Sequence, residues 1–162
     1  MIDPLVRPAR SGDEAALAEL EREARAALVD QRGGGRWLVA HPEIAERWRE
    51  LVEQGSSQGR TNGRFSVFVA HIDDVVVGYL VAHDDVEPDG DTLVRVDQVW
   101  VTPEARELGF GDELLAAAIE AGRAAGAVAV EGQALPGDRH TKNLYERAGI
   151  VARLITTYRR FD

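Results

Sequence analysis

Residues 99 to 111 read Val99-Trp100-Val101-Thr102-Pro103-Glu104-Ala105-Arg106-Glu107-Leu108-Gly109-Phe110-Gly111. A β-rich run ends at the Thr-Pro pair, and two glycines lead into a segment with helical periodicity. Glycine has no Cβ, so the backbone can approach a ligand closely there. The first N–H groups of a helix have no partner inside the helix, and the helix dipole adds partial positive charge. Such a loop could hold a diphosphate, with Arg106 adding a charge-assisted hydrogen bond, but two glycines alone are more typical of a plain turn from a strand into a helix.

The segments on either side of this loop follow two hydrophobic periods. β-rich runs between turn residues predict strands, and apolar residues three or four apart predict amphipathic helices. Strands are expected at residues 5–10, 65–70, 75–83, 92–101, 127–133 and 151–160. Helices are expected from Ser11 or Asp13 to Leu28 and at about 42–54, 110–125 and 138–148, with Asp138 as the last N-cap and Gly149 as the last stop signal. The glycines at 33–35 are expected to end the first helical region.

The resulting order of elements is β-α-α-β-β-β-α-β-α-β. A tight turn at Asp73-Asp74 makes a hairpin and needs antiparallel pairing, whereas the strand–helix–strand connection after Val101 needs parallel pairing. We predict an α/β fold with one mixed central sheet of about 6–7 strands flanked by about four helices. No internal repeat is visible, so residues 1–162 are expected to form a single domain.

Composition restricts the classes of function. The formal net charge is −9, which argues against broad binding to nucleic acid or anionic membranes, because both need a surplus of Lys and Arg. No run of about 18 apolar residues is present, so no membrane span is expected. The absence of cysteine excludes disulfides, thiolate metal sites and a cysteine nucleophile.

The same features favour a cytoplasmic protein of bacterial origin. The first residues lack the basic and then apolar order of a secretory signal. A chain without cysteine is compatible with a reducing compartment. Lys142 is the only lysine beside eighteen arginines, a bias that indicates a G+C-rich bacterial genome.

Two motifs carry a resemblance to a known family. Arg106-x-x-Gly109-x-Gly111 is similar to the (Q/R)-x-x-G-x-(G/A) motif of the GNAT superfamily of N-acetyltransferases, and it follows a strand as in that family. The stretch from Asn143 to Gly149, with Leu-Tyr-Glu at its centre, resembles the family's L-Y-E-x-x-G-F segment, and the order of elements agrees. The resemblance implies acetyl-CoA as co-substrate and a primary amine as acceptor. A dinucleotide-binding fold would instead need G-x-G-x-x-G on the first strand, which is missing.

The resemblance also implies the residues that hold the cofactor. They are Val99, Trp100, Val101, Arg106, Glu107, Leu108, Gly109, Phe110, Gly111 and Asp112. The main chain of Val99 and Val101 would pair with the pantetheine arm, and the N–H of Val101 would be an oxyanion donor. Glu107 and Leu108 depart from the glycine and basic residue common in the family. With Asp112, the acid at 107 is expected to weaken binding of the diphosphate.

Acetyl transfer from a thioester needs a deprotonated amine and a proton for the departing thiolate. Tyr145 occupies the family's L-Y position, where the hydroxyl commonly faces the thioester sulfur, and is the expected acid. Two carboxylates remain open as the base. Asp97 lies four residues before Val101, and Glu131 lies on the next strand.

Two functions stay open. One is an active N-acetyltransferase that transfers the group directly in a ternary complex. The other is a non-catalytic acyl-CoA-binding sensor or interaction module, which Glu107 and Asp112 would favour. The acceptor is unidentified, a homodimer is compatible with the sequence, and no metal is expected. His41, His71, His83 and His140 show no metal-ligand spacing and are expected to be ordinary histidines, and Trp37 and Trp48 to be core residues.

Overall fold

A computed structural model describes residues 5–56 and 65–161 of the chain. Its sheet has five strands in the order β1-β2-β3-β4-β5. The strands are β1 Val6–Pro8, β2 Phe65–Ile72, β3 Val75–Val86, β4 Thr92–Val101 and β5 Ala129–Gly132. The first four pair antiparallel, and β4 and β5 pair parallel. The mixed sheet predicted from the hairpin and the crossover is confirmed.

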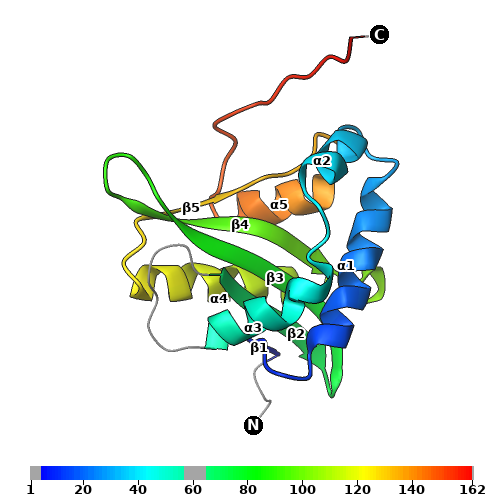
Figure 1. The fold of residues 1–162 in the computed structure, drawn as a ribbon, viewed down its shortest axis with the longest axis vertical. Helices are drawn as coiled ribbons and strands as arrows, with labels where there is room; N and C mark the ends of the chain where they lie inside the picture. Colours follow the sequence, from blue (N-terminus) through cyan, green and yellow to red (C-terminus); the bar gives the residue numbers. More distant parts are fainter. Residues whose placement is uncertain (1–4, 57–64, 162) are drawn as a thin grey trace.

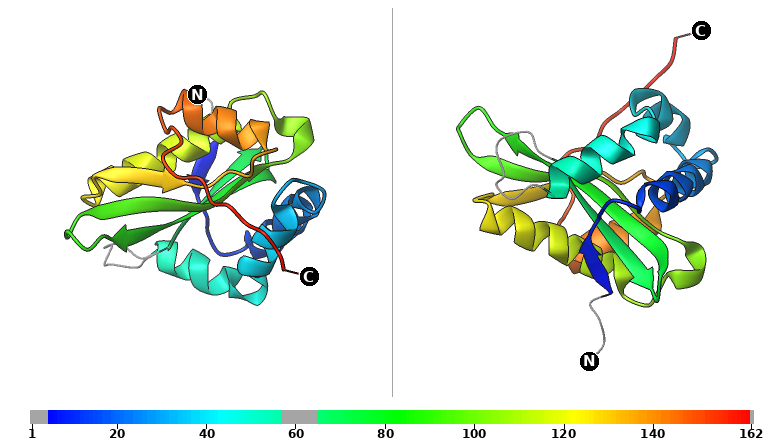
Figure 2. Two further views of the ribbon diagram at one scale, coloured as in Figure 1. Left: turned by 90° about the horizontal axis from the view of Figure 1, so that it is seen from above. Right: turned by 60° about the horizontal axis from the view of Figure 1, so that its bottom comes forward.

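Helices cover both faces of this sheet (Figures 1 and 2). They are α1 Glu14–Leu28, α2 Gly34–Ala40, α3 Trp48–Ser56, α4 Phe110–Ala124 and α5 Arg139–Arg147, with short 3₁₀ turns at Ala45–Arg47 and Pro103–Ala105. The first three lie on one face of the sheet, and α4 and α5 lie on the other (Figure 2).

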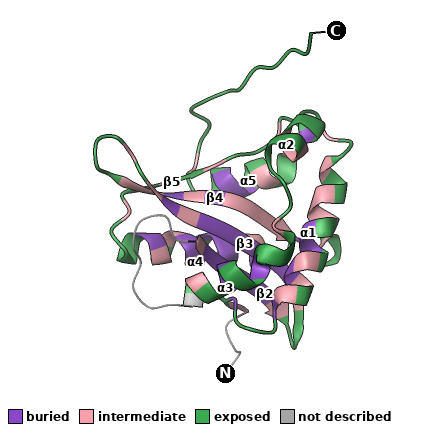
Figure 3. Cartoon of the chain, viewed as in Figure 1, coloured by how far each residue is buried: buried purple, intermediate pink, exposed green. Residues whose placement is uncertain are grey.

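Each face has its own apolar core. The buried residues are purple in Figure 3, along the central strands and on the helix sides that pack against them. On the α1/α3 face the core includes Leu17, Trp48, Leu51, Val69 and Tyr79. On the α4/α5 face it includes Leu80, Val94, Leu114, Leu115 and Tyr145. Because both cores press on the central strands, β2 and β3 are nearly continuous apolar runs with few polar interruptions.

A β-bulge interrupts β4 at Asp97. Gln98 pairs with Val81, but Val96 pairs with Ala82, so Asp97 is the extra residue. Parallel pairing of β4 with β5 stops nearby, at Val96 and Gly132, while β4 continues to Val101. The two strands therefore separate beyond the bulge.

Two helix predictions need correction. The glycines at 33–35 do not end a helical region: α2 begins among them, with Gly33 as N-cap at φ +82°. A Cβ on Gly34 would lie 1.7 Å from the carbonyl oxygen of Leu28, so glycine permits the tight junction between α1 and α2. The helix expected at about 42–54 starts only at Trp48. The buried carboxylate of Glu21 accepts the N–H of Ile44 at 2.9 Å, so that donor needs no helical partner.

The last predicted strand, 151–160, is not formed, and the described sheet has five strands where 6–7 were expected. These residues run extended and exposed away from the body (Figure 1). A strand exists only where a neighbour accepts its hydrogen bonds, and local β-preference is weak without that pairing. Leu154 and Ile155 are accordingly 88% and 83% exposed.

Candidate active site

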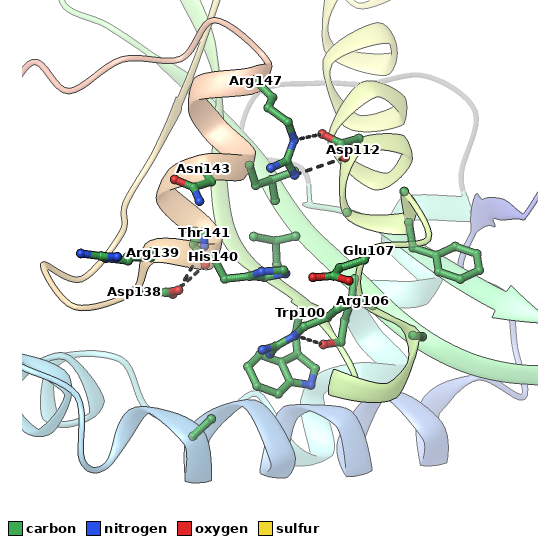
Figure 4. Close-up of a pocket in the computed structure, with 18 of the residues that line it drawn as sticks. Trp100, Arg106, Glu107, Asp112, Asp138, Arg139, His140, Thr141, Asn143 and Arg147 are labelled. Atoms are coloured by element: carbon green, nitrogen blue, oxygen red, sulfur yellow. Dashed lines mark hydrogen bonds and ion pairs between the residues drawn. The ribbon is translucent and has the colours of Figure 1, made fainter.

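A cavity of about 650 Å³ lies where β4 ends and α4 begins (Figure 4). Nine of the ten predicted cofactor residues line it, and only Leu108 does not. The other walls come from α5 and the two residues before it, from Ala27 in the last turn of α1, and from Gln31 just after that helix. Ala27 and Gln31 were missed from sequence, because no local pattern places the end of α1 opposite a loop 80 residues later.

The open edge of β4 forms one side of this cavity. The N–H of Thr102 donates to the carbonyl of Val77 in β3 at 2.8 Å. Because successive residues of a strand direct their N–H groups to opposite sides, those of Val101 and Val99 point toward the β5 side. Among the residues that the structure describes, no strand pairs with β4 there, since β5 has already separated. The Nε–H of Arg106 donates to the carbonyl of Val101 at 3.0 Å, as this orientation requires.

The two motif glycines serve different purposes. Gly109 is the N-cap of α4 at φ +88°, a conformation that disfavours any side chain. Gly111 lies inside the first turn, where an added Cβ would be 3.5 Å from Leu144, an ordinary contact. The fold itself therefore does not require glycine at position 111, whereas the backbone conformation requires it at position 109. Glu107, at φ +67°, also takes a left-handed conformation in this turn.

The charges of the loop are arranged differently from the sequence expectation. Asp112 forms two hydrogen bonds with Arg147 of α5, at 2.9 and 3.2 Å (Figure 4). Its charge is therefore compensated within the protein. Arg106 lies over the ring of Trp100, 4.5 Å from the ring centroid. Glu107 is exposed on the cavity wall and remains the acid that opposes an anion there.

His140, expected to be an ordinary histidine, lines the cavity beside Arg106 (Figure 4). Burial lowers the pKa of His140, and the positive charge of Arg106 lowers it further. The one sequence signal that could have found it is its place two residues after the N-cap Asp138, which accepts the N–H of Thr141 at 3.0 Å.

Tyr145 is buried on α5 and its hydroxyl reaches β5. A Cβ on Gly132 would lie 2.6 Å from the Tyr145 hydroxyl, so glycine makes room for this ring. Gly132 is the last residue of β5 paired with β4, which places the hydroxyl where the strands separate. Burial raises the pKa of Tyr145, and the carboxylates of Asp138 and Asp97 raise it further, so the hydroxyl stays protonated at neutral pH.

The two carboxylates left open by the sequence have different surroundings. Asp97, at the bulge, lies 2.7 Å from Nδ1 of His83 and is close enough to affect Tyr145. Glu131 instead forms an ion pair with Arg95, which also binds Asp85 and Glu87. None of Tyr145, Asp97 and Glu131 lines the cavity itself.

Within residues 5–56 and 65–161 no three acidic or histidine side chains are grouped to hold a metal ion. Over the same residues no helix is long and apolar enough to cross a membrane. Trp48 is a core residue, as predicted. The same prediction is wrong for Trp37, which is only half-buried and stacks on His41 with ring centroids 4.2 Å apart.

The structure is an α/β fold in which the parallel strands β4 and β5 separate and a glycine-containing loop joins β4 to the N-terminus of α4. A sequence profile described as the acetyltransferase (GNAT) family matches residues 23–150. The chain belongs to this family of acetyltransferases. A search of curated proteins finds no match.

Solved structures share the fold at low sequence identity. A tetramutant of the BH1408 protein from Bacillus halodurans has a TM-score of 0.74 at 18% identity, covering 99% of this chain and 100% of that one. Ribosomal-protein-alanine N-acetyltransferase from Brucella melitensis biovar Abortus 2308 has a TM-score of 0.67 at 18% identity, covering 96% and 99%. AAC(6')-Iy in complex with the bisubstrate analogue CoA-S-monomethyl-acetylneamine has a TM-score of 0.66 at 19% identity, covering 96% and 97%.

Proposed function

We propose that this protein transfers the acetyl group of acetyl-CoA to a primary amine, directly within a ternary complex. The observation that carries the proposal is the continuous path from the open edge of β4 to the start of α4. Such a path offers main-chain partners to an extended amide-containing arm and unpaired N–H groups to a diphosphate. Both parts are needed to hold coenzyme A.

The residues present fit the cofactor. The N–H groups of Phe110, Gly111 and Asp112 at the start of α4 would hold the diphosphate, with Arg106 beside them. Val99 and Val101 would pair with the pantetheine arm. Bound acetyl-CoA supplies the activated thioester, and the Val101 N–H would stabilise negative charge on its carbonyl oxygen.

Proton transfer is assigned to groups at the separation of β4 and β5. Tyr145 donates to the departing thiolate, which its protonated hydroxyl beside Gly132 supports. Asp97 is preferred over Glu131 as the carboxylate on the accepting side, because it lies at the bulge and its charge reaches Tyr145, whereas Glu131 is held by Arg95. The chain has no cysteine, so no acyl-cysteine intermediate forms.

The acceptor is proposed to be a small cationic amine. Carboxylates of α1 border the approach to β4: Glu23 accepts from Trp100 Nε1 at 3.1 Å and from Thr102 Oγ1 at 2.8 Å. A net charge of −9 also attracts cations. Among the structural neighbours, an aminoglycoside acetyltransferase from a soil metagenomic sample was solved with sisomicin.

The test is acetyl-CoA turnover with a panel of amines, read as release of free thiol. Millimolar acetyl-CoA should also raise the melting temperature by about 2–8 °C, because ligand at 100 times its Kd adds about 2.7 kcal/mol. A shift in melting temperature with no thiol released from any amine would favour the alternative, an acyl-CoA sensor, which the exposed Glu107 also supports. No shift at all would contradict both functions.

Within this proposal the protein acts in the bacterial cytoplasm and forms a homodimer. The exposed residues 151–161 support the dimer, since Leu154, Ile155 and Phe161 would be covered by a second copy. Light scattering after size-exclusion chromatography should give twice the chain mass, and a chain ending at Ile150 should give the monomer mass. A monomeric full-length protein would contradict the dimer.

A further inference from the structure

A histidine and an aspartate lie together beside the bulge of β4. Nδ1 of His83 is 2.7 Å from Oδ2 of Asp97, and the two side chains are 28% and 32% exposed. His83 is the register partner of Arg95 in β4, and Asp97 follows two residues later. Both side chains therefore remain reachable by a small molecule while they hold each other in place.

This pair and Tyr145 belong to opposite faces of the sheet. The ring of His83 lies 5.6 Å from that of Phe65, which packs against the core of the α1/α3 face. Tyr145 belongs to the core of the α4/α5 face. Pairing of β4 with β5 ends at Val96 and Gly132, and the charge of Asp97 reaches Tyr145, so the pair and the tyrosine lie on the two sides of the place where the strands separate.

We propose that the His83–Asp97 pair is the proton acceptor of the acetyl transfer, with Nε2 of His83 as the receiving atom. The proposal rests on the proposed function above. Asp97 accepts the hydrogen bond of Nδ1–H and so fixes the tautomer that leaves the Nε2 lone pair free. No described residue forms a hydrogen bond with Nε2.

The protons balance as follows. An incoming ammonium group gives one proton to Nε2, and its nitrogen then forms the bond to the carbonyl carbon. The carbon–sulfur bond breaks as Tyr145 gives its proton to the thiolate. The second proton lost by the nitrogen restores the Tyr145 hydroxyl, and the imidazolium of His83 releases its proton to water. The products are the amide, the free thiol and one proton.

The charges around His83 suit this task. The hydrogen bond to Asp97 raises the pKa of His83, and Asp85 in β3 adds to it, while burial and Arg95 in β4 oppose. From β2 the apolar ring of Phe65 faces it. A base is most effective when its pKa lies near the working pH, and histidine is the side chain whose ordinary pKa lies closest to neutrality.

The His83→Asn variant distinguishes a role of His83 as proton acceptor from a purely structural role through its hydrogen bond to Asp97. Its amide N–H₂ can keep the hydrogen bond to Asp97 near the Nδ1 position, but it has no basic atom. We expect kcat to fall by about 10²–10⁴ at neutral pH, the acidic limb of the pH–rate profile to disappear, and acetyl-CoA affinity to stay within about twofold. His71→Gln is the matched control, because Nδ1 of that ring lies 2.8 Å from the Asp73 carbonyl in the β2–β3 turn, and this change should leave the profile unchanged.

The interaction between His83 and Asp97 can be tested without an activity assay. NMR titration should place the pKa of His83 above its usual value of about 6.5, and Asp97→Asn should lower it. Wild-type turnover and an unchanged acidic limb in His83→Asn would overturn this proposal and leave the proposed function intact. A wild-type protein without turnover toward any amine would overturn both.

Discussion

Replacing Tyr145 by phenylalanine tests the acid directly. The ring stays against Gly132 and within its core, and only the hydroxyl is lost. No described residue shares a hydrogen bond with that hydroxyl, so we expect less than about 0.5 kcal/mol of destabilisation, or about 2 °C in melting temperature. Tyr145→Ala, by contrast, removes a buried ring and should cost about 3–5 kcal/mol.

In Tyr145→Phe the turnover rate should fall strongly although the stability hardly changes. Loss of a positioned acid lowers kcat by about 10²–10⁴, or about 2.7–5.5 kcal/mol of activation free energy. The assay is thiol release per folded molecule at saturating acetyl-CoA, with Kd measured by calorimetry and expected within a few-fold of wild type. Tyr158→Phe, at a tyrosine that is 64% exposed, is the control. Wild-type turnover in a folded Tyr145→Phe protein would refute this role for the hydroxyl.

Three further predictions concern the cavity. Glu107→Gly should tighten acetyl-CoA binding by about 0.5–1 kcal/mol in calorimetry, since an exposed like charge is removed; weaker binding would mean that the carboxylate serves the site. Gly111→Val should abolish acetyl-CoA binding with the far-ultraviolet dichroism unchanged, and normal affinity would place the diphosphate elsewhere. The pKa of His140 is lowered in the free protein, and a bound diphosphate would raise it. The affinity for acetyl-CoA should therefore be greatest at a pH below the His140 pKa of the free protein, and should fall as the pH rises through the His140 pKa of the complex. Titration between about pH 5 and 8 should show this slope, and His140→Asn should remove it; an unchanged slope would contradict the assignment.

The parts of the fold fixed by local chemistry could be predicted from sequence. β4 begins and ends at the predicted residues, and Asp138 caps α5 as expected, because hydrophobic period and capping act over a few neighbours. The start of α3 depended on the carboxylate of Glu21, 23 residues away from Ile44 in sequence, so no local pattern could show it. The prediction of a strand at 151–160 was wrong for the same reason, because the presence of a partner strand cannot be read from the local sequence.

The site divides in the same way. Nine of the ten residues predicted for the cofactor lie together on the cavity wall because the turn from β4 into α4 is contiguous in sequence; their role in binding stays a prediction. The pairing of Asp112 with Arg147 could not be foreseen, because it joins two helices that meet only after the crossover is formed. His83 was dismissed because its partner lies 14 residues away across a hairpin. The roles of Tyr145, Asp97 and Glu131 stay predictions.

The extra residue in β4 determines which residues of the strand face which side of the sheet. Before Asp97, the even-numbered Val94 and Val96 face the core under α4; after it, the odd-numbered Val99 and Val101 do. Removing one residue there would turn Val99 and Val101 to the opposite face, and with them every N–H that now points away from β3. Substitutions in this strand act on single contacts, whereas a change of length by one acts on all of them. Loss or gain of a single codon between Val96 and Gln98 should therefore rearrange the whole open edge of β4, whereas a point mutation in it changes one contact.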